Sequence, residues 1–499
     1  MTTILPLGSL PTYHAQQDPG RACLTHGGQT ISRGEFEARA NRRARALANH
    51  GVGHGDHVAL ILPNCAHYFE LAFALWKIGA TPVPISPSAT DRELAVYFEL
   101  IEPKLILSDR AFGSGFPEIL VDGAVDETLS AEPVPEIVSK FWRIVMSGGS
   151  TGRPKLIVDR TPGLADPNIA VLQQKVGGTH LNPGPLYHSG PFGVSARGLF
   201  VGSHLVNMEK FDPIGMLGLI ERYRADWAYF VPTMMHRIWR LPEEERNGFD
   251  LSSLEVAFHT ASACPPWLKQ AWIDWLGPTR IWEMYGSAEN VGYTLIRGDE
   301  WLAHRGSVGR MQGNAHIAIF DENGERAPTG QVGEVYFLSD EGSENRFHYI
   351  GANRKAIGDW QSFGDLGYVD EDDYLYIVDR RTDMIVSGGV NVYPAEIEAV
   401  LDSHPDVSSS VVIGLPDADL GSRVHAIVQA ADHARDPLSD EVLRSWLKGQ
   451  LVNYKVPRSI EFVTHPLRDN AGKVRRGALR DERIAQLAQR PLDMAAAPK

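Results

Sequence analysis

Apolar segments of two kinds alternate along the N-terminal part of the chain. Residues 34–50 and 65–78 repeat apolar side chains at a helical spacing, which predicts a helix in each segment. The short apolar runs at residues 57–62, 81–85 and 104–108 are typical of buried strands. Strands that alternate with helices in this way indicate a largely parallel sheet with helices on both faces.

The same alternation returns in the middle of the chain and then changes character. Strands are predicted at residues 254–259 and 280–282, with a helix at 266–276 between them. From about residue 306 to 378 the pattern is strand-rich and is divided by turn sequences such as Glu322-Asn323-Gly324. We interpret this stretch as a β-rich subdomain that completes the N-terminal part.

A domain boundary is predicted close to residues 379–384. The strands and helices that follow have the extent of a small α+β domain. The sequence therefore predicts an α/β protein with a large N-terminal domain at residues 1–381 and a small C-terminal domain at residues 382–499. The large domain is expected to hold mostly parallel sheets flanked by helices, together with the β-rich subdomain.

Chain length and charge narrow the class of protein. The 499 residues exceed one ordinary core and indicate two or three packed units. The 48 basic and 62 acidic side chains give a formal net charge of −14, which argues against a general nucleic-acid binder because phosphate would be repelled. An anionic ligand must therefore be held by a local cluster of donors.

Cysteine usage and hydropathy indicate a cytoplasmic protein. The three cysteines, Cys23, Cys65 and Cys264, are far apart and odd in number, so neither a disulfide framework nor a zinc cluster is expected. The first residues lack the basic and then apolar pattern of a secretory signal. No run of about 18 apolar residues is present, so insertion into a membrane is not expected.

The sequence SGGSTGRPK at residues 147–155 has the composition of a phosphate-binding loop. Glycines let the backbone approach an anion, the hydroxyl groups can donate to phosphate oxygens, and Lys155 supplies positive charge. Apolar runs precede and follow the segment, so it is expected in a hairpin and not at the start of a helix, where a Walker loop would lie. On composition alone, a flexible surface turn is the other interpretation.

This segment resembles the signature loop of the adenylate-forming superfamily, which includes acyl-CoA synthetases, adenylation domains and beetle luciferase. Further segments match the motifs of that family in the same order over nearly the whole chain, and the acyl-CoA synthetases are the most similar members. The resemblance implies that the loop holds the phosphates of ATP through Ser147, Gly148, Gly149, Ser150, Gly152 and Lys155. It also implies that Thr151 acts in catalysis and contacts Mg²⁺.

Two short motifs follow the loop in the order that the family has. PLYHSG at residues 185–190 is similar to the segment that carries a histidine or aromatic residue beside the acyl site, which assigns a catalytic role to His188. HTASACP at residues 259–265 resembles the turn that holds the adenine. The small side chains there would let a flat base approach, which assigns adenine contacts to Ala261, Ser262 and Ala263.

EMYGSAE at residues 283–289 resembles the aromatic-Gly-x-Thr-Glu motif of the family. Tyr285 is expected to stack on the adenine, and Glu289 is expected to bind Mg²⁺ through oxygen and to act in catalysis. Further nucleotide contacts are assigned to Glu283, Met284, Gly286 and Ser287. Ala288 stands where the family has a threonine that touches the α-phosphate, so this contact is lost unless Ser287 replaces it.

The remaining motifs lie on both sides of the predicted boundary. Asp365, after a glycine, matches the aspartate that binds both ribose hydroxyl groups, and Arg380 matches the arginine that reaches the same ribose. Lys473 in NAGKVRR stands at the family's catalytic lysine, whose ammonium would neutralise charge at the α-phosphate.

The stretch after Arg380 resembles the hinge and the coenzyme A face of the family. Thr382 stands where many relatives have an Asp or Lys hinge residue, and threonine can still absorb the backbone change of a domain rotation. Gly388 and Gly389 resemble the loop that lines the pantetheine tunnel after that rotation. The resemblance therefore implies a mobile C-terminal domain.

Together the motifs imply an ATP-dependent acid–CoA ligase that uses ATP, Mg²⁺ and coenzyme A. The acid would form an acyl-adenylate with release of pyrophosphate, and coenzyme A would then take the acyl group with release of AMP. The small residues at 189–198, Gly292 and the apolar segment 229–238 favour a bulky or hydrophobic acid. No basic residue stands out in these segments to bind a second carboxylate.

Three alternatives stay open at this point. A free-standing adenylation enzyme would load the thiol of a carrier protein, although no carrier domain is recognisable in the chain. A luciferase-like oxygenase would use the same scaffold, and Ala288 together with Thr382 would suit a non-catalytic nucleotide-binding homologue. The sequence also leaves open which acid is used, the resting domain orientation and the assembly, a homodimer included.

Overall fold

The computed structural model describes residues 3–121, 126–148, 154–431, 438–469 and 472–489. The chain forms two compact units. The larger unit comprises Met1–Ala261, Gln270–Ala318 and Tyr336–Phe363, and the smaller unit comprises Ser262–Lys269, Ile319–Val335 and Gly364–Lys499. These units are groups of residues that pack together. The predicted boundary between residues 381 and 382 marks where the C-terminal domain would rotate. Packing does not test a rotation, so that boundary stays a prediction.

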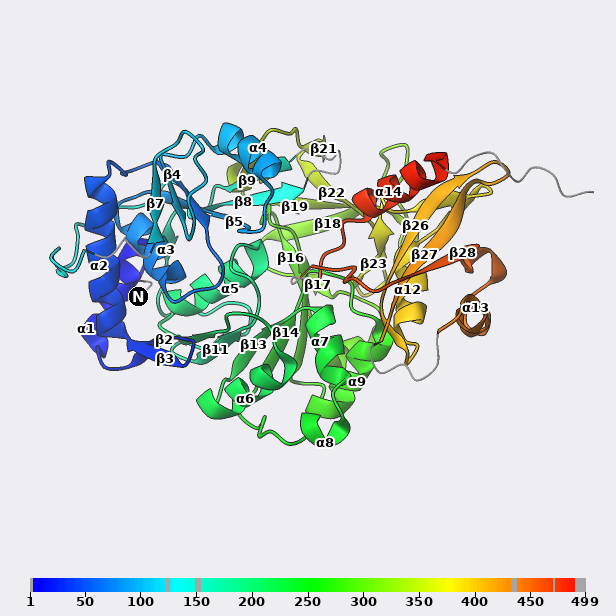
Figure 1. Cartoon of the computed structure of the whole chain (residues 1–499), viewed down its shortest axis with the longest axis horizontal. Helices are drawn as coiled ribbons and strands as arrows, with labels where there is room; N and C mark the ends of the chain where they lie inside the picture. The colour runs from blue at the N-terminus through cyan, green and yellow to red at the C-terminus, as the bar shows by residue number, and fades with distance from the viewer. Residues whose placement is uncertain (1–2, 122–125, 149–153, 432–437, 470–471, 490–499) are drawn as a thin grey trace, which may run out of the picture. The chain divides into compact units, whose positions relative to one another are not determined.

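A nine-stranded sheet organises the larger unit (Figure 1). Its order is β17 (Arg310–Met311), β16 (Tyr293–Arg297), β15 (Ile281–Gly286), β14 (Val256–His259), β13 (Trp227–Phe230), β11 (Thr179–Asn182), β12 (His204–Asn207), β2 (Ala22–His26) and β3 (Gln29–Ser32). The strands from β15 to β2 run parallel, and antiparallel strands continue the sheet at both ends. The predicted parallel sheet is therefore confirmed.

A second, parallel sheet uses the three strands that the N-terminal apolar runs predict. Its order is β5 (Thr81–Ile85), β4 (His57–Ile61), β6 (Leu105–Ser108) and β7 (Glu118–Leu120). The helices of this part of the chain are α1 (Leu10–Gln17), α2 (Arg33–Asn49), α3 (His67–Lys77) and α4 (Asp91–Ile101). Both α2 and α4 begin with a capping box, formed by Ser32 with Glu35 and by Thr90 with Glu93, which explains where they start.

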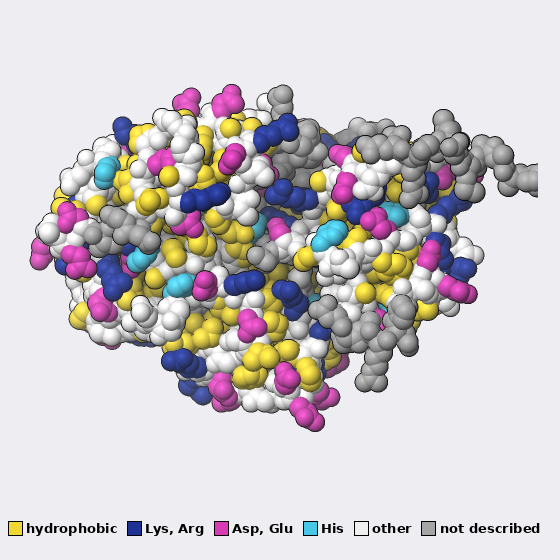
Figure 2. Space-filling view, viewed as in Figure 1, with side chains coloured by type: hydrophobic (Ala, Val, Ile, Leu, Met, Phe, Trp, Pro, Cys, Tyr) yellow, Lys and Arg dark blue, Asp and Glu magenta, His cyan; other side chains and the backbone are white. Residues whose placement is uncertain are grey.

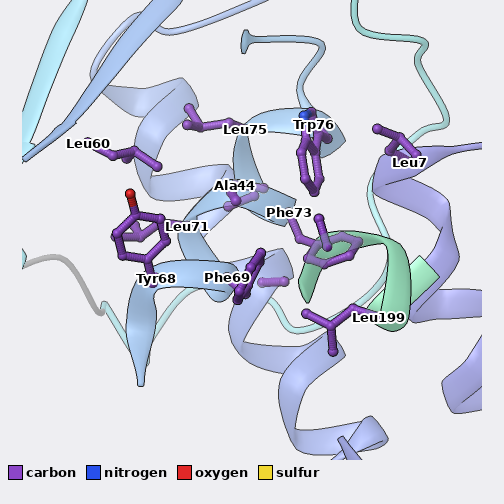
Figure 3. Packing of buried hydrophobic residues seen from close by; sticks show 14 of the residues in the cluster. Leu7, Ala44, Leu60, Tyr68, Phe69, Leu71, Phe73, Leu75, Trp76 and Leu199 are labelled. Atoms are coloured by element: carbon purple, nitrogen blue, oxygen red, sulfur yellow. The ribbon is translucent and has the colours of Figure 1, made fainter. Parts of the chain in front are cut away.

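The helix α3 lies in the core of the larger unit. Figure 3 shows Phe69, Phe73 and Trp76 of α3 in one cluster with Leu7 and Leu199. Two charged residues of the same helix are also buried, and each has a partner. The carboxylate of Glu70 pairs with Arg43 at 2.8 Å, and Lys77 pairs with Glu37 at 2.9 Å. Pairing is what allows charges in an otherwise apolar core helix.

The helix α5 (Ser189–Phe200) lies between the large sheet and a hairpin (Figure 1). The hairpin consists of β8 (Arg143–Gly148) and β9 (Pro154–Asp159), and β20 (Phe347–Ile350) pairs with β9. Ser147 stands opposite Lys155, so the segment SGGSTGRPK does connect two antiparallel strands as predicted. Further short elements of the region are β1 (Leu5–Pro6), β10 (Leu164–Ala165), α6 (Pro213–Tyr223), α7 (Pro232–Trp239), α8 (Glu243–Arg246), α9 (Pro266–Leu276) and α10 (Gly298–Ala303).

The strand-rich stretch predicted after residue 306 is present. It contains β18 (Ala315–Phe320), β19 (Gly333–Ser339), the short helix α11 (Ser343–Arg346), β21 (Lys355–Ile357), β22 (Trp360–Val369) and β23 (Leu375–Arg380). The long strand β22 pairs with β21 through its first residues and with β23 through its last residues. This second pairing positions Asp365 and Arg380, the two residues predicted to bind the ribose.

The C-terminal part of the smaller unit is an α+β fold, as predicted. Its sheet has the order β26 (Val407–Asp417), β27 (Gly421–Ala430) and β28 (Ser459–Val463), and the hairpin β24 (Ile385–Ser387) and β25 (Val390–Val392) precedes it. The helices α12 (Pro394–Asp402), α13 (Asp440–Lys448) and α14 (Arg476–Gln489) accompany these strands. Among the residues that the structure describes, no helix has the length and apolar character needed to cross a membrane.

Candidate active site

The phosphate-loop hairpin ends in a cluster of three polar side chains within the larger unit. Lys155 follows the first residue of β9, and its Nζ lies 3.6 Å from Oε1 of Glu289. The same Nζ lies 3.7 Å from the ring centroid of Tyr349 on β20. Tyr349 Oη donates a hydrogen bond of 2.6 Å to Glu289 Oε1. The pairing of β20 with β9 brings Tyr349 beside Lys155, and the Glu289 carboxylate completes the cluster.

The Glu289 carboxylate is held on one of its two oxygens. Its side chain is 8% exposed, and both of its contacts to described residues fall on Oε1. Burial, followed by the Glu289 charge, raises the pKa of Tyr349, so the phenol stays a hydrogen-bond donor at neutral pH. The Oε2 atom thus faces no described protein partner. Mg²⁺ takes hard oxygen ligands and usually only one or two carboxylates, so Glu289 fits as one ligand for this ion.

Most of the loop itself lies outside the described residues. Gly149, Ser150, Thr151 and Gly152 are in the segment 149–153, and their predicted contacts with phosphate and Mg²⁺ stay predictions. Ser147 and Gly148 end β8, opposite Lys155 and Pro154. The hairpin therefore holds both ends of the loop in register beside the Glu289 cluster.

The predicted adenine turn contains one unusual backbone conformation. β14 ends at His259, and Ala261 then adopts a φ of 82°. This left-handed conformation costs a residue with a Cβ about 1 kcal/mol or more, and such strain is concentrated at functional turns. Ser262 and Ala263 follow at the start of a segment of the smaller unit. The adenine role of the three residues stays a prediction.

The motif EMYGSAE spans the end of β15 and the turn after it. Glu283, Met284, Tyr285 and Gly286 are residues of β15. The ring of Tyr285 packs at 6.1 Å from that of Phe337, in a tilted arrangement. Ser287 follows the strand, and its Oγ is buried without a hydrogen bond to any described residue. A hydroxyl is thus present beside Ala288, but it points away from solvent, so replacement of the missing threonine stays a prediction.

The two residues assigned to the ribose face one another across the β22–β23 pair. Asp365 is the cross-strand partner of Arg380, and Arg380 Nε lies 3.2 Å from Asp365 Oδ1. Asp365 is buried, whereas Arg380 is exposed. The strand pairing thus places the carboxylate of Asp365 beside the guanidinium of Arg380 in the smaller unit, although a turn separates the two residues in the sequence. Both side chains can therefore reach one ligand.

The residue before Arg380 carries a buried carboxylate. Asp379 accepts hydrogen bonds from the backbone N–H groups of Ala395 at 3.1 Å and of Arg380 at 2.7 Å. Burial raises the pKa of Asp379 to about 6, and these hydrogen bonds oppose the shift only in part. Asp379 therefore joins β23 to the first turn of α12 at an electrostatic cost.

This cost predicts a pH effect on the stability of the smaller unit. Because the folded state raises the Asp379 pKa, it binds the proton more tightly than the unfolded state, and stability falls as the pH rises from about 4 to 6. We expect Asp379→Asn to remove this slope, so that the melting temperature of the wild type falls relative to that of the variant between pH 4.5 and 7. Parallel melting curves for the two proteins would contradict the assignment.

Lys473 and the glycine pair lie in the smaller unit. Gly388 and Gly389 form the turn between β24 and β25, with φ values of 59° and 79° that favour glycine. Lys473 is exposed, and its backbone N–H donates to Asp469 Oδ1 at 2.9 Å. His188 lies in the larger unit as the residue before α5, with its ring 4.6 Å from that of Tyr187. The catalytic roles of Lys473 and His188 stay predictions.

Tyr349 is a member of the site that the sequence pattern does not indicate. Its segment FHYI is an ordinary strand sequence, and the partner Glu289 is distant in the chain. Only the pairing of β20 with the phosphate-loop hairpin brings the phenol to the carboxylate. Acidic and basic side chains are intermixed on the face of the molecule in Figure 2, although the net charge of the chain is −14.

Comparison with known proteins gives a consistent result over the whole chain. A family model described as AMP-binding enzyme matches residues 12–341, and one described as AMP-binding enzyme C-terminal domain matches residues 396–473. A feruloyl-CoA synthase from an Amycolatopsis species is 30% identical over 491 residues, which cover 95% of this chain and 98% of that protein. A fatty acid–[acyl-carrier-protein] ligase of Streptomyces coeruleorubidus is 29% identical over 502 residues, covering 94% and 95% of the two chains.

Solved structures show the same relationship. The o-succinylbenzoate CoA synthetase of Bacillus subtilis, in complex with its acyl-adenylate intermediate, superposes with a TM-score of 0.81 and 25% identity, covering 96% of this chain and 99% of that one. The same enzyme with ATP and a magnesium ion gives a TM-score of 0.80 at 25% identity, covering 96% and 100%. The resemblance and the fold class predicted from the sequence are thus confirmed. Since the first family model matches more than half of the chain, this protein belongs to the AMP-binding enzyme family.

Proposed function

We propose that the protein is an ATP-dependent acid–CoA ligase. A carboxylic acid reacts with ATP to give an acyl-adenylate and pyrophosphate, and the thiol of coenzyme A then displaces AMP to give the acyl-CoA. The observation that carries the proposal is the cluster of Lys155, Glu289 and Tyr349 at the end of the phosphate-loop hairpin. It combines a cation for phosphate with a fixed carboxylate oxygen for a metal ion, which is what adenylation requires.

The first step must bring two anions together. The carboxylate of the acid attacks the α-phosphate in line with the departing pyrophosphate, so the protein mainly aligns the reactants and offsets their repulsion. Glu289 would hold Mg²⁺ together with Thr151, and the bound ion would neutralise phosphate charge. Lys155, with the loop residues, would hold the phosphates, and the Tyr349 hydrogen bond keeps the Glu289 carboxylate in one orientation.

The remaining predicted residues would bind the adenine and the ribose, act on the α-phosphate, or serve the second step. Tyr285 would stack on the adenine, and Asp365 with Arg380 would bind the ribose. Lys473 would neutralise charge on the α-phosphate during adenylation. Rotation of residues 382–499 about Thr382 would then bring the turn at Gly388 to the coenzyme A side.

The walls of the region beside α5 support a bulky, largely apolar acid. Val194 of α5 packs in one cluster with Tyr229, Val231 and Phe258, and Met284 borders this cluster. The start of α5 follows His188 directly and carries Gly190 and Gly193, where Tyr229, Arg143 and Arg197 approach the helix closely. Aromatic and aliphatic walls of this kind suit an aryl or other bulky carboxylic acid.

A carrier-protein thiol is the second candidate for the acceptor. The observation that favours it is the fatty acid–[acyl-carrier-protein] ligase, which matches 94% of this chain at 29% identity. The adenylation chemistry is the same for both acceptors. Either reaction would take place where ATP is available, which agrees with a cytoplasmic enzyme whose three cysteines form no disulfide bond with one another.

One experiment tests the reaction and names the acceptor. The protein is incubated with ATP, Mg²⁺ and a panel of carboxylic acids, with coenzyme A, with a phosphopantetheinylated carrier protein, or with neither, and products are identified by mass spectrometry. We expect acid-dependent pyrophosphate in all three cases and a thioester only with coenzyme A. A thioester on the carrier protein alone would make that the acceptor, and the absence of pyrophosphate with every acid would overturn the proposed function.

A further inference from the structure

One face of α5 carries glycines that polar side chains of other elements, and of α5 itself, approach closely. A Cβ atom added to Gly190 would lie 2.8 Å from Oη of Tyr229. A Cβ atom added to Gly193 would lie 3.0 Å from Nη1 of Arg143 and 3.0 Å from Nη1 of Arg197. Residues at this spacing share one side of a helix, with Cβ positions about 5–6 Å apart. The Tyr229 phenol and the guanidiniums of Arg143 and Arg197 therefore lie along the side of α5 that carries Gly190 and Gly193.

Among the described residues, this cluster contains two guanidiniums and one carboxylate. Arg143 Nε lies 3.6 Å from Oδ2 of Asp159, a fully buried carboxylate, and both guanidiniums stack on Trp142 at 4.2 and 4.7 Å. Arg143 also donates to the Ser189 carbonyl at 2.7 Å. The buried Arg143 and the half-buried Arg197 thus lie near one carboxylate, and desolvation lowers the pKa of both, that of Arg143 to about 10.

Arg197 has N–H donors that make no hydrogen bond to a described residue. It is half-buried, and Nη1 donates to the Gly193 carbonyl at 3.2 Å. The guanidinium has five N–H donors in a fixed plane, and this single bond leaves most of them without a partner in the described chain. The nearby Asp159 pairs with Arg143 at 3.6 Å through Oδ2, which makes no hydrogen bond to a described residue, and accepts a hydrogen bond from the backbone N–H of Thr161 through Oδ1. An oxygen acceptor placed beside Gly193 would therefore complete the coordination of Arg197.

Tyr229 offers a second unused donor on the same face. Its side chain is 1% exposed, and its Oη makes no hydrogen bond to any residue that the structure describes. A hydroxyl at the end of an otherwise apolar side chain can donate to a ligand that reaches it. Apolar walls with a few polar groups among them are typical of sites that select a small molecule.

We infer that Arg197 determines the specificity of the acid site by receiving an oxygen acceptor at the end of the acid remote from the reacting carboxylate, with Tyr229 as a neighbouring donor. The inference rests on the proposed function, which places the acid beside His188 and α5. Because the Arg197 guanidinium lies beside Gly193, it is about 8 Å along the helix from His188. An aryl or medium-chain acid with an oxygen substituent at its far end spans this length.

Pairs of acids that differ only in the distal oxygen test the inference. Cinnamic acid is compared with its 4-hydroxy, 4-carboxy and 2-hydroxy derivatives, and octanoic acid with octanedioic acid, by kcat/KM for pyrophosphate release. In the wild type we expect the distally substituted member to exceed its unsubstituted partner at least tenfold in the pairs that are turned over, and the 2-hydroxy isomer to gain nothing. The 4-hydroxy and 4-carboxy arms separate a neutral acceptor from an anionic one.

Substitutions then connect the preference to the cluster. Arg197→Met is expected to bring the ratio for each pair close to one, and Arg197→Lys to retain part of the preference for the carboxylate because the charge remains. Tyr229→Phe is expected to lower the ratio for the 4-hydroxy acid. Arg246→Met is the matched control, since Arg246 also stacks on a tryptophan, at 3.9 Å, and donates to a carbonyl. It should leave all ratios unchanged.

The failures are distinguishable. Pyrophosphate release without any advantage for the distally substituted acids, or with an advantage that survives in Arg197→Met, would overturn this inference alone. If no acid released pyrophosphate, the proposed function would fail and the inference would fall with it.

Discussion

Lys473→Ala is expected to separate the two half-reactions. Removing the ammonium should slow acid-dependent ATP–pyrophosphate exchange by about 10²–10³-fold, the usual effect of deleting one electrostatic group aimed at developing charge. Thioester formation from a synthetic acyl-adenylate and coenzyme A should stay within about threefold of the wild type, because the α-phosphate charge has then already been redistributed. Both half-reactions can be followed by mass spectrometry on the same preparation.

The side chain of Lys473 makes this experiment clean. It is exposed in the loop that precedes α14, so its removal leaves the packed core of the smaller unit intact. Lys448 at the end of α13 is also exposed, and Lys448→Ala serves as the matched control for the loss of one surface charge. Equal loss of both half-reactions in Lys473→Ala would remove the assignment to adenylation. An unchanged exchange rate would make Lys473 an ordinary surface residue.

Local patterns predicted the elements of this fold well. The apolar runs at residues 57–62 and 81–85 became the adjacent parallel strands β4 and β5, because buried parallel strands are continuously apolar. The segment around Phe69 became the buried core helix α3, although it contains Glu70 and Lys77. Each of these predictions depends on information within a few residues, which periodicity and capping express directly.

Contacts between distant segments could not be predicted in the same way. The pairing of β20 with β9 brings Tyr349 to Glu289, and no feature of the segment around Tyr349 predicts this contact. Arg197 stands in a run of small residues, SGPFGVSARG, and this pattern indicates room for a bulky acid without singling out the arginine. Only the fold shows which groups lie around the Arg197 guanidinium, because β8 brings Arg143 and β9 brings Asp159 to the same place.

The departures from the family pattern are also clearer in structural terms. Ala288 removes a hydroxyl, and the neighbouring Ser287 Oγ is buried without a hydrogen bond to any described residue. A rotation about χ1 would change where this hydroxyl points, at a cost that a phosphate contact could offset. The sequence shows that a hydroxyl is present in the motif, but its direction is set by the turn after β15.

Glu289→Gln is expected to impair adenylation about 10²-fold or more and to raise the Mg²⁺ concentration needed for half-maximal rate. The amide has nearly the same shape as the carboxylate, but it lacks the negative charge that a hard divalent cation prefers, and metal stabilisation of phosphate charge is worth several kcal/mol. The measurement is the rate of pyrophosphate exchange over a series of Mg²⁺ concentrations. The hydrogen bond from Tyr349 can still be accepted by the amide oxygen, so the fold around β20 should persist.

Two further variants show whether the effect belongs to the metal ion. Tyr349→Phe removes only the donor that orients the Glu289 carboxylate, and we expect a smaller loss of about 10-fold, within the range known for groups that orient metal ligands. Lys155→Met removes the ion pair with Glu289 and a cation for phosphate, and it should raise the KM for ATP while the Mg²⁺ requirement stays close to that of the wild type. If Glu289→Gln left the Mg²⁺ requirement unchanged and matched Lys155→Met in every other respect, Glu289 would serve to position Lys155, and the metal ion would have to be held by other residues.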